Sequence, residues 1–95
     1  MAIPLHATCA MHRDPGRFVY LIRSSSDSTR WYVGLTCDVA RRLEEHNDGL
    51  SPHTAKYGPW KLVLSMEFAD EYRALAFEKY LKTGSGRAFS NRHFR

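Results

Sequence analysis

Two short runs of large apolar and β-branched residues, separated by a polar turn, constrain the fold of this chain most. One run is Phe18-Val19-Tyr20-Leu21-Ile22-Arg23, and the other is Arg30-Trp31-Tyr32-Val33-Gly34-Leu35. Runs of this length and composition are typical of β-strands, and the short polar connection predicts that they pair as a hairpin. Alternate residues of a strand share a face, but the sequence leaves the register open. A common face for Tyr20 and Tyr32 is therefore a hypothesis.

A helix is expected directly after the second strand. Asp38, or Thr36 just before it, can cap its first turn, and Asn47-Asp48-Gly49 supplies residues that tolerate the left-handed backbone of a helix end. Val39 and Leu43 are spaced to form its apolar stripe.

The same helix carries two adjacent arginines that its geometry separates. At about 100° per residue, Arg42 and His46 lie beside the apolar stripe. Arg41, Glu44 and Glu45 point away from it. The pattern therefore predicts one arginine held against the body of the protein and the other in solvent.

A third strand and a second helix complete the expected fold. Large apolar residues alternate over residues 60–68, and Asp70 is a suitable cap for a helix over residues 71–82. Gly84-Ser85-Gly86 is expected to close that helix, and residues 87–95 to form a short basic tail with room for a last turn or two. The predicted class is α/β (α+β), a small three-stranded, mostly antiparallel sheet flanked by helices.

Size and composition limit what the chain can do. With 95 residues and 43% hydrophobic content it has enough material for one core, so we interpret residues 17–95 as one domain. Residues 1–16 show neither helical nor strand periodicity, and we interpret them as a flexible leader. The net charge of +4 favours polyanionic partners. Cys9 and Cys37 provide no disulfide framework and are expected as reduced thiols. No segment resembles a secretory signal or a membrane span, so a cytoplasmic protein without a membrane partner is expected.

Taken in order, these residues resemble the GIY-YIG nuclease superfamily over residues 18 to about 91. The first triplet reads Phe18-Val19-Tyr20 where the family pattern has Gly-Ile-Tyr, and the second, Tyr32-Val33-Gly34, has valine for isoleucine. Each keeps its tyrosine. The rest of the matching set is Arg42, His46, the loop Thr54-Ala55-Lys56-Tyr57, Glu78 and the segment 82–87. The chain is similar to a minimal form of the nuclease domain found in the incision subunit of bacterial excision repair.

The resemblance implies an endonuclease that hydrolyses phosphodiester bonds in DNA, in repair or recombination. Its implied catalytic residues are Tyr20, Tyr32, Arg42, His46 and Glu78. Glu78 is the implied ligand of Mg²⁺ or Mn²⁺, ions that keep most of their waters and need only one or two protein oxygens. A free tyrosine titrates near pH 10, so neighbouring cations are expected to favour the phenolate, with His46 as proton relay. Which tyrosine is the base stays open.

The implied nucleic-acid contacts are Gly34, Arg41, Lys56, Arg87 and Asn91. The expected partners are branched, damaged or duplex DNA and a protein that supplies specificity, because family members obtain specificity from appended domains or partners. The oligomeric state is not predicted.

Plainer alternatives exist for each assignment. Arg42 can be a surface arginine whose stem covers apolar side chains, and His46 a packed, hydrogen-bonded histidine. Glu78 is spaced for an i,i+4 ion pair with Lys82, and Lys56 can be a solvated loop residue. For the whole chain, the main alternative is a nucleic-acid-binding module with little or no cleavage. A structural or partner-binding protein is a third.

Overall fold

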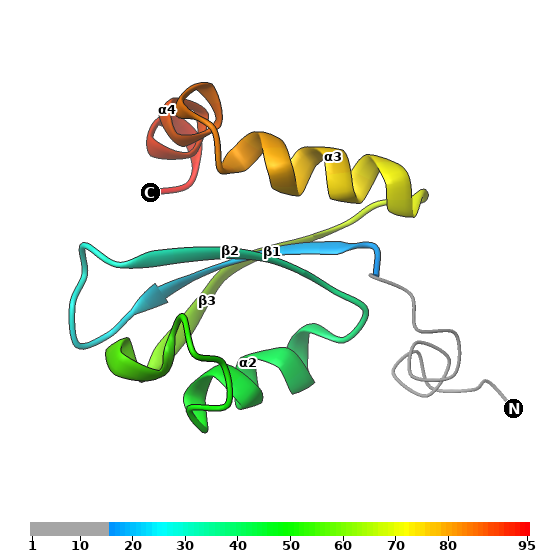
Figure 1. The fold of residues 1–95 in the computed structure, drawn as a ribbon. Coiled ribbons are helices and arrows are strands. Elements are labelled where there is room, and N and C mark those ends of the chain that lie inside the picture. Colours follow the sequence, from blue (N-terminus) through cyan, green and yellow to red (C-terminus); the bar gives the residue numbers. More distant parts are fainter. Residues whose placement is uncertain (1–15) are drawn as a thin grey trace, which may run out of the picture.

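The two predicted strands form the hairpin at the centre of the fold (Figure 1). A computed structural model describes residues 16–95, so residues 1–15 of the expected leader, Cys9 among them, lie outside the described residues. The elements, in chain order, are β1 (Phe18–Ser24), β2 (Trp31–Thr36), α2 (Val39–Asn47), the 3₁₀ turn η1 (Ala55–Tyr57), β3 (Trp60–Glu67), α3 (Glu71–Leu81) and α4 (Gly84–His93).

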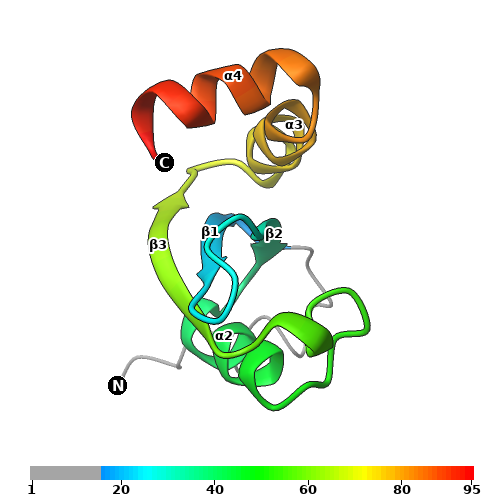
Figure 2. The same cartoon turned by 90° about the vertical axis from the view of Figure 1, so that its left-hand side faces the viewer.

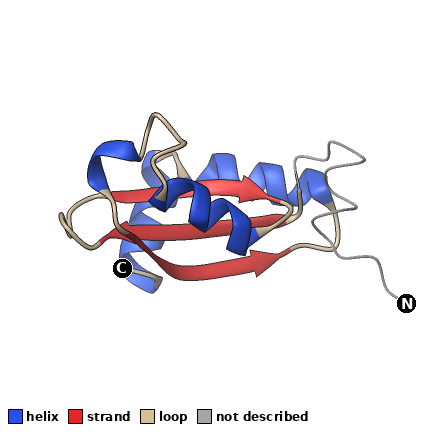
Figure 3. Ribbon diagram, turned by 90° about the horizontal axis from the view of Figure 1, so that it is seen from below, coloured by secondary structure: helices blue, strands red, loops and turns tan. Residues whose placement is uncertain are grey.

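The sheet has three strands in the order β2-β1-β3, and both pairs of neighbours are antiparallel (Figure 3). In the hairpin, Tyr20 lies opposite Gly34 and Ile22 lies opposite Tyr32. Directly opposed residues share a face, as do residues two apart, so the two tyrosines lie on the same face of the sheet. The register thus confirms the hypothesis that the hairpin alone left open.

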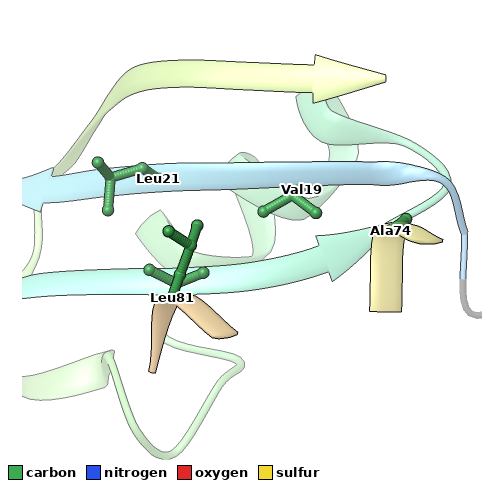
Figure 4. Close-up of a cluster of buried hydrophobic side chains, with 5 residues drawn as sticks. Val19, Leu21, Ala74 and Leu81 are labelled. Atoms are coloured by element: carbon green, nitrogen blue, oxygen red, sulfur yellow. The ribbon is translucent and has the colours of Figure 1, made fainter. Parts of the chain in front are cut away.

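Helices cover both faces of the sheet (Figures 1 and 2). The helices α3 and α4 lie on one face, and α2 and η1 lie on the other. On the α3 face, Val19 and Leu21 of β1 pack against Ala74 and Leu81 of α3 (Figure 4). On the α2 face, the buried apolar residues are Tyr20, Ile22 and Trp60. Because β1 is covered on both faces, its run of apolar residues is continuous rather than alternating.

Each helix begins at a side-chain cap. Asp38 Oδ1 accepts a hydrogen bond from the backbone N–H of Arg41 at 3.1 Å, and Asp70 Oδ1 accepts one from Tyr72 at 2.8 Å, as the sequence predicted. No helix of residues 16–95 is long and apolar enough to cross a membrane.

The last helix corrects the prediction for the C-terminal segment. Gly84-Ser85-Gly86 was expected to end a helix, but Thr83 Oγ1 accepts from the N–H of Gly86 at 3.1 Å and starts the ten-residue helix α4 there. Gly86 is buried where α4 turns back on α3: a Cβ at this position would lie 1.8 Å from the carbonyl oxygen of Tyr80. The glycine permits a close helix contact and does not serve as a terminator.

Cys37 also departs from the prediction. It is disulfide-bonded and not a free thiol. Two isolated cysteines carry no spacing pattern from which pairing can be inferred.

Candidate active site

A buried hydrogen-bonded chain links the sheet to α2 and to the loop before η1. The Oη atom of Tyr20 lies 2.7 Å from Nε2 of His46, and Nδ1 of the same ring lies 2.7 Å from Oγ1 of Thr54. Each of the three residues is at most 2% exposed. Buried polar groups at such distances fix one another in place, because losing any partner leaves an unsatisfied group.

Burial determines the charge of the Tyr20 and His46 side chains. Desolvation, and then the neighbouring Tyr32, raise the pKa of Tyr20 to about 12, although Arg42 acts to lower it. Desolvation, and then the charge of Arg42, lower the pKa of His46 to about 4. Both groups are therefore neutral near pH 7. The expected influence of a nearby arginine on Tyr20 is present, but burial outweighs it and Tyr20 rests as a phenol.

Because Tyr20 and His46 are both neutral, the donor and the acceptor of each hydrogen bond can be assigned. The Thr54 hydroxyl has the Ser51 carbonyl oxygen as acceptor at 3.5 Å, so Thr54 accepts from Nδ1–H of His46. The Nε2 atom of His46 is then an acceptor, and the Tyr20 hydroxyl donates to it. Thr54 was part of the matching sequence pattern, but only the structure shows that it orients the histidine.

Tyr32 is the more accessible of the two phenols. It is partly buried, its ring centroid lies 6.2 Å from that of Tyr20, and it meets the ring of His46 edge-on at 5.0 Å. Gly34 is buried beneath the ring of Tyr20, where a Cβ would lie 2.3 Å from the phenol oxygen. Gly34 therefore makes room for Tyr20, a function that its expected role as a nucleic-acid contact did not include.

The two arginines of α2 lie as helix geometry predicted. Arg42 is partly buried and close enough to Tyr20 for each to influence the pKa of the other, whereas Arg41 is exposed. Glu45 was expected to point away, but its side chain is half-buried because it pairs with both arginines. One carboxylate oxygen lies 2.7 Å from Nη1 of Arg42, and the other lies 3.7 Å from Nε of Arg41.

Glu78 approaches from the opposite side of the sheet, since α3 and α2 cover different faces (Figure 1). Its side chain is 11% exposed, and its carboxylate forms an ion pair with Nζ of Lys82. That Nζ atom lies 5.9 Å from the ring centroid of Tyr32. The i,i+4 pair considered from the sequence is thus present, and it brings Glu78 toward the β2 edge at Tyr32. No hydrogen bond or ion pair within residues 16–95 joins Glu78 directly to the Tyr20 chain.

A single carboxylate is available for a metal ion at this edge. Among residues 16–95, no three His, Cys, Asp or Glu side chains come together as a metal-binding group. A hydrated divalent cation needs only one or two protein oxygens. Glu78 is nearly buried and already attracts an ammonium group, which fits that limited requirement.

The predicted nucleic-acid contacts do not form one surface. Arg41 and Lys56 are exposed on α2 and η1, on one side of the sheet, while Arg87 and Asn91 are exposed on α4, on the other. Asn91 Oδ1 accepts a hydrogen bond from Nη1 of Arg95 at 3.2 Å.

A cationic groove beside Tyr32 was not predicted. It has a volume of about 520 Å³ and is formed by the end of the hairpin turn, β2, the end of α3, and α4 with the C-terminus. The charged residues that line it are Arg30, Lys82, Arg87 and Arg95. The basic tail was the only sign of it in the sequence, because the other walls come from segments far apart along the chain.

Comparison with known proteins agrees with this arrangement. The family model described as the GIY-YIG catalytic domain matches residues 17–92. The chain belongs to the GIY-YIG family. The sequence-based family assignment and the α/β fold are thereby confirmed, and the family description, which names a catalytic domain, supports a nuclease role. No solved structure matches the chain.

Individual relatives of this GIY-YIG chain are of two kinds. It is 40% identical over 73 residues to the structure-specific endonuclease subunit SLX1 of Homo sapiens, a match that covers 67% of this chain and 26% of that protein. It is 34% identical over 66 residues to UPF0213 protein BH0048 of Halalkalibacterium halodurans, covering 68% of each. UPF0213 protein YazA of Bacillus subtilis is 32% identical over 66 residues, with 68% and 65% covered. The chain spans between 15% and 26% of the length of the SLX1 relatives that it matches.

Proposed function

We propose that this chain is a divalent-metal-dependent endonuclease that hydrolyses phosphodiester bonds in DNA. One observation carries the proposal: Tyr32 lies between the Tyr20–His46 pair on one side and Lys82 with Glu78 on the other. A phenol, a nearby guanidinium and a carboxylate around one sheet edge are groups suited to phosphodiester hydrolysis.

Tyr32 is assigned the role of the base that takes a proton from the attacking water. It is partly exposed, whereas Tyr20 is 2% exposed and already donates its hydrogen to His46. In hydrolysis the water oxygen bonds to phosphorus, the bond from phosphorus to the leaving oxygen breaks, and the water loses a proton. Tyr32 first releases its own phenolic proton to solvent, and its accessible oxygen then accepts the proton that the attacking water loses. Tyr20 and His46 then act as positioning residues, because their rings pack against the ring of Tyr32.

Arg42 and Glu78 are assigned roles in stabilising the negative charge of the reacting phosphate. The Arg42 guanidinium has five N–H donors, and its pair with Glu45 leaves others for phosphoryl oxygens. Glu78 is the residue that would hold Mg²⁺ or Mn²⁺, whose positive charge stabilises the leaving oxygen when bound. Lys82 must release the Glu78 carboxylate for this, and the released ammonium stays beside Tyr32 to attract phosphate.

The name of the human relative supports the proposed substrate and partner. SLX1 is named a structure-specific endonuclease and a subunit. This supports branched, damaged or duplex DNA in repair or recombination as the substrate of this chain, and a protein partner that supplies specificity.

The test is nicking of supercoiled plasmid with Mg²⁺ or Mn²⁺, with EDTA as the metal-free control. We expect metal-dependent nicking that falls by at least about 100-fold in Glu78→Gln, because the metal ligand is lost while the side chain keeps its size. Glu71→Gln, at the other end of α3, is the matched control and should cut like the wild type. Undiminished nicking by Glu78→Gln contradicts the assignment.

A second candidate function rests on the Glu78–Lys82 ion pair. If Lys82 holds that carboxylate permanently, the chain binds nucleic acid without cutting it. A salt-sensitive gel shift without products, in either metal, supports this binding module over the enzyme.

A further inference from the structure

The cationic groove beside Tyr32 carries charge that the protein does not neutralise. Two of its four cations have carboxylate partners: Arg30 pairs with Asp27 at 3.5 Å, and Lys82 pairs with Glu78. Arg87 and Arg95 form no ion pair with any carboxylate of residues 16–95. Burial is the main cause that lowers the pKa of Arg95, and the charge of Arg87 lowers it further, so the two guanidiniums are close enough to repel each other. An anion between them would relieve that repulsion.

Arg95 is held in the groove by an aromatic ring. Its guanidinium carbon lies 4.8 Å from the centre of the Trp31 ring, and that of Arg23 lies 5.5 Å from the same ring. The C-terminus lies at the same end of the molecule as the hairpin turn, which explains how the last residue reaches β2 (Figures 1 and 3). Because two arginine side chains already pack against the indole ring of Trp31, this ring is poorly placed to stack on a base. The groove therefore presents positive charge and no base-stacking platform.

The position and size of the groove indicate what occupies it. Tyr32 belongs to its lining, so an anion at Arg87 and Arg95 lies next to the proposed cleavage position. Its volume of about 520 Å³ is that of a small-ligand site. One polynucleotide strand fits such a hollow, whereas a duplex meets only its rim.

We propose that Arg87 and Arg95 bind the phosphates of a single DNA strand that leaves the cleavage position along this groove. The inference rests on the proposed endonuclease function and narrows its substrate to DNA with a single-stranded arm. Free inorganic polyphosphate has the same charge chemistry and is the competing occupant.

The experiment measures binding without cleavage. Fluorescence anisotropy of a fluorescein-labelled oligothymidylate of about 15 nucleotides is followed in EDTA for the wild type, Arg87→Gln/Arg95→Gln and the matched control Lys61→Gln/Arg92→Gln. The control removes two exposed cations that do not line the groove. Circular dichroism melting of each variant checks folding, and Arg87→Lys/Arg95→Lys keeps the charge if the glutamine pair unfolds.

We expect the groove pair to weaken binding about 10-fold and to make the dependence of log K on log salt shallower by roughly 1.4, the value for two phosphates on a single strand. The control pair should lose less than about 3-fold. Equal losses in both pairs, or an equal loss against a duplex of the same length, overturn the proposal. So does a preference for polyphosphate over oligothymidylate at equal phosphate concentration.

Cleavage is scored separately on a duplex with a single-stranded arm. If no protein variant cuts but the groove pair alone loses binding, the endonuclease proposal fails, and only the binding of a single strand by Arg87 and Arg95 stands. If the wild type cuts and the groove pair binds and cuts normally, the groove proposal fails alone.

Discussion

At the scale of single residues, the two tyrosines are no longer equivalent. Tyr20 is buried over Gly34 and donates to a neutral histidine, whereas Tyr32 is partly exposed beside the cationic groove. From the sequence, a common face for the two phenols was a hypothesis and their roles were left open, and the hairpin register then placed both on one face. Burial supplies the difference, because a phenol that water does not reach is poorly placed to deprotonate water.

Replacing each hydroxyl separates the two roles. Tyr32→Phe should lose most cleavage, about 100-fold or more, with little change in stability, because that partly exposed hydroxyl is the proposed acceptor of the water proton. Tyr20→Phe should lower the free energy of unfolding by about 1–3 kcal/mol, because Nε2 of the buried His46 loses its donor. Urea denaturation and single-turnover cleavage of both variants measure the two effects. Normal cleavage by Tyr32→Phe would exclude it as the acceptor of the water proton.

At the scale of elements, the contact between α3 and α4 sets the geometry of the groove. Lys82 follows α3 and Arg87 lies early in α4, so the turn between the helices, with Gly86 buried against Tyr80, brings the two cations to one groove. Sequence analysis treated the glycines as a stop signal, because glycine near a helix end usually is one. Only the Thr83 cap and the close backbone approach show that a helix begins there.

A methyl group at Gly86 should disrupt this packing. In Gly86→Ala the new Cβ would lie 1.8 Å from the Tyr80 carbonyl oxygen and 2.6 Å from the Leu81 Cα, so α4 must shift. We expect a loss of roughly 1–3 kcal/mol in the free energy of unfolding, measured with urea. Gly84→Ala is the matched control, since a Cβ there meets nothing within 4 Å. A loss no greater in Gly86→Ala than in the control would contradict the close contact.

At the scale of the whole molecule, the sequence pattern predicted the individual strands and helices. The features that depend on how these elements pack together were visible only in the structure. The apolar runs of β1 and β2 and the stripe of α2 were enough to place Tyr20 in a hairpin and to choose Arg42 over Arg41. The hairpin register and the burial of His46 depend on how three layers pack, which a single sequence does not encode locally. The groove is still less predictable, because Arg30 and Arg95 are far apart in the chain and meet only through the fold.

The burial of a neutral histidine makes the stability of the whole domain depend on pH. The folded-state pKa of His46 is about 4, below its ordinary value of 6.5, so between these values the unfolded chain binds more protons than the folded one. Stability should therefore fall as the pH is lowered from about 6.5 to about 4, with a contribution from this residue on the order of 2 kcal/mol. Urea denaturation near pH 7 and near pH 4.5 should show a smaller fall for His46→Gln than for the wild type. The exposed His53→Gln should keep the wild-type fall, because its ring stays in water in both states. Identical pH profiles for the wild type and His46→Gln would mean that folding does not lower the pKa of His46.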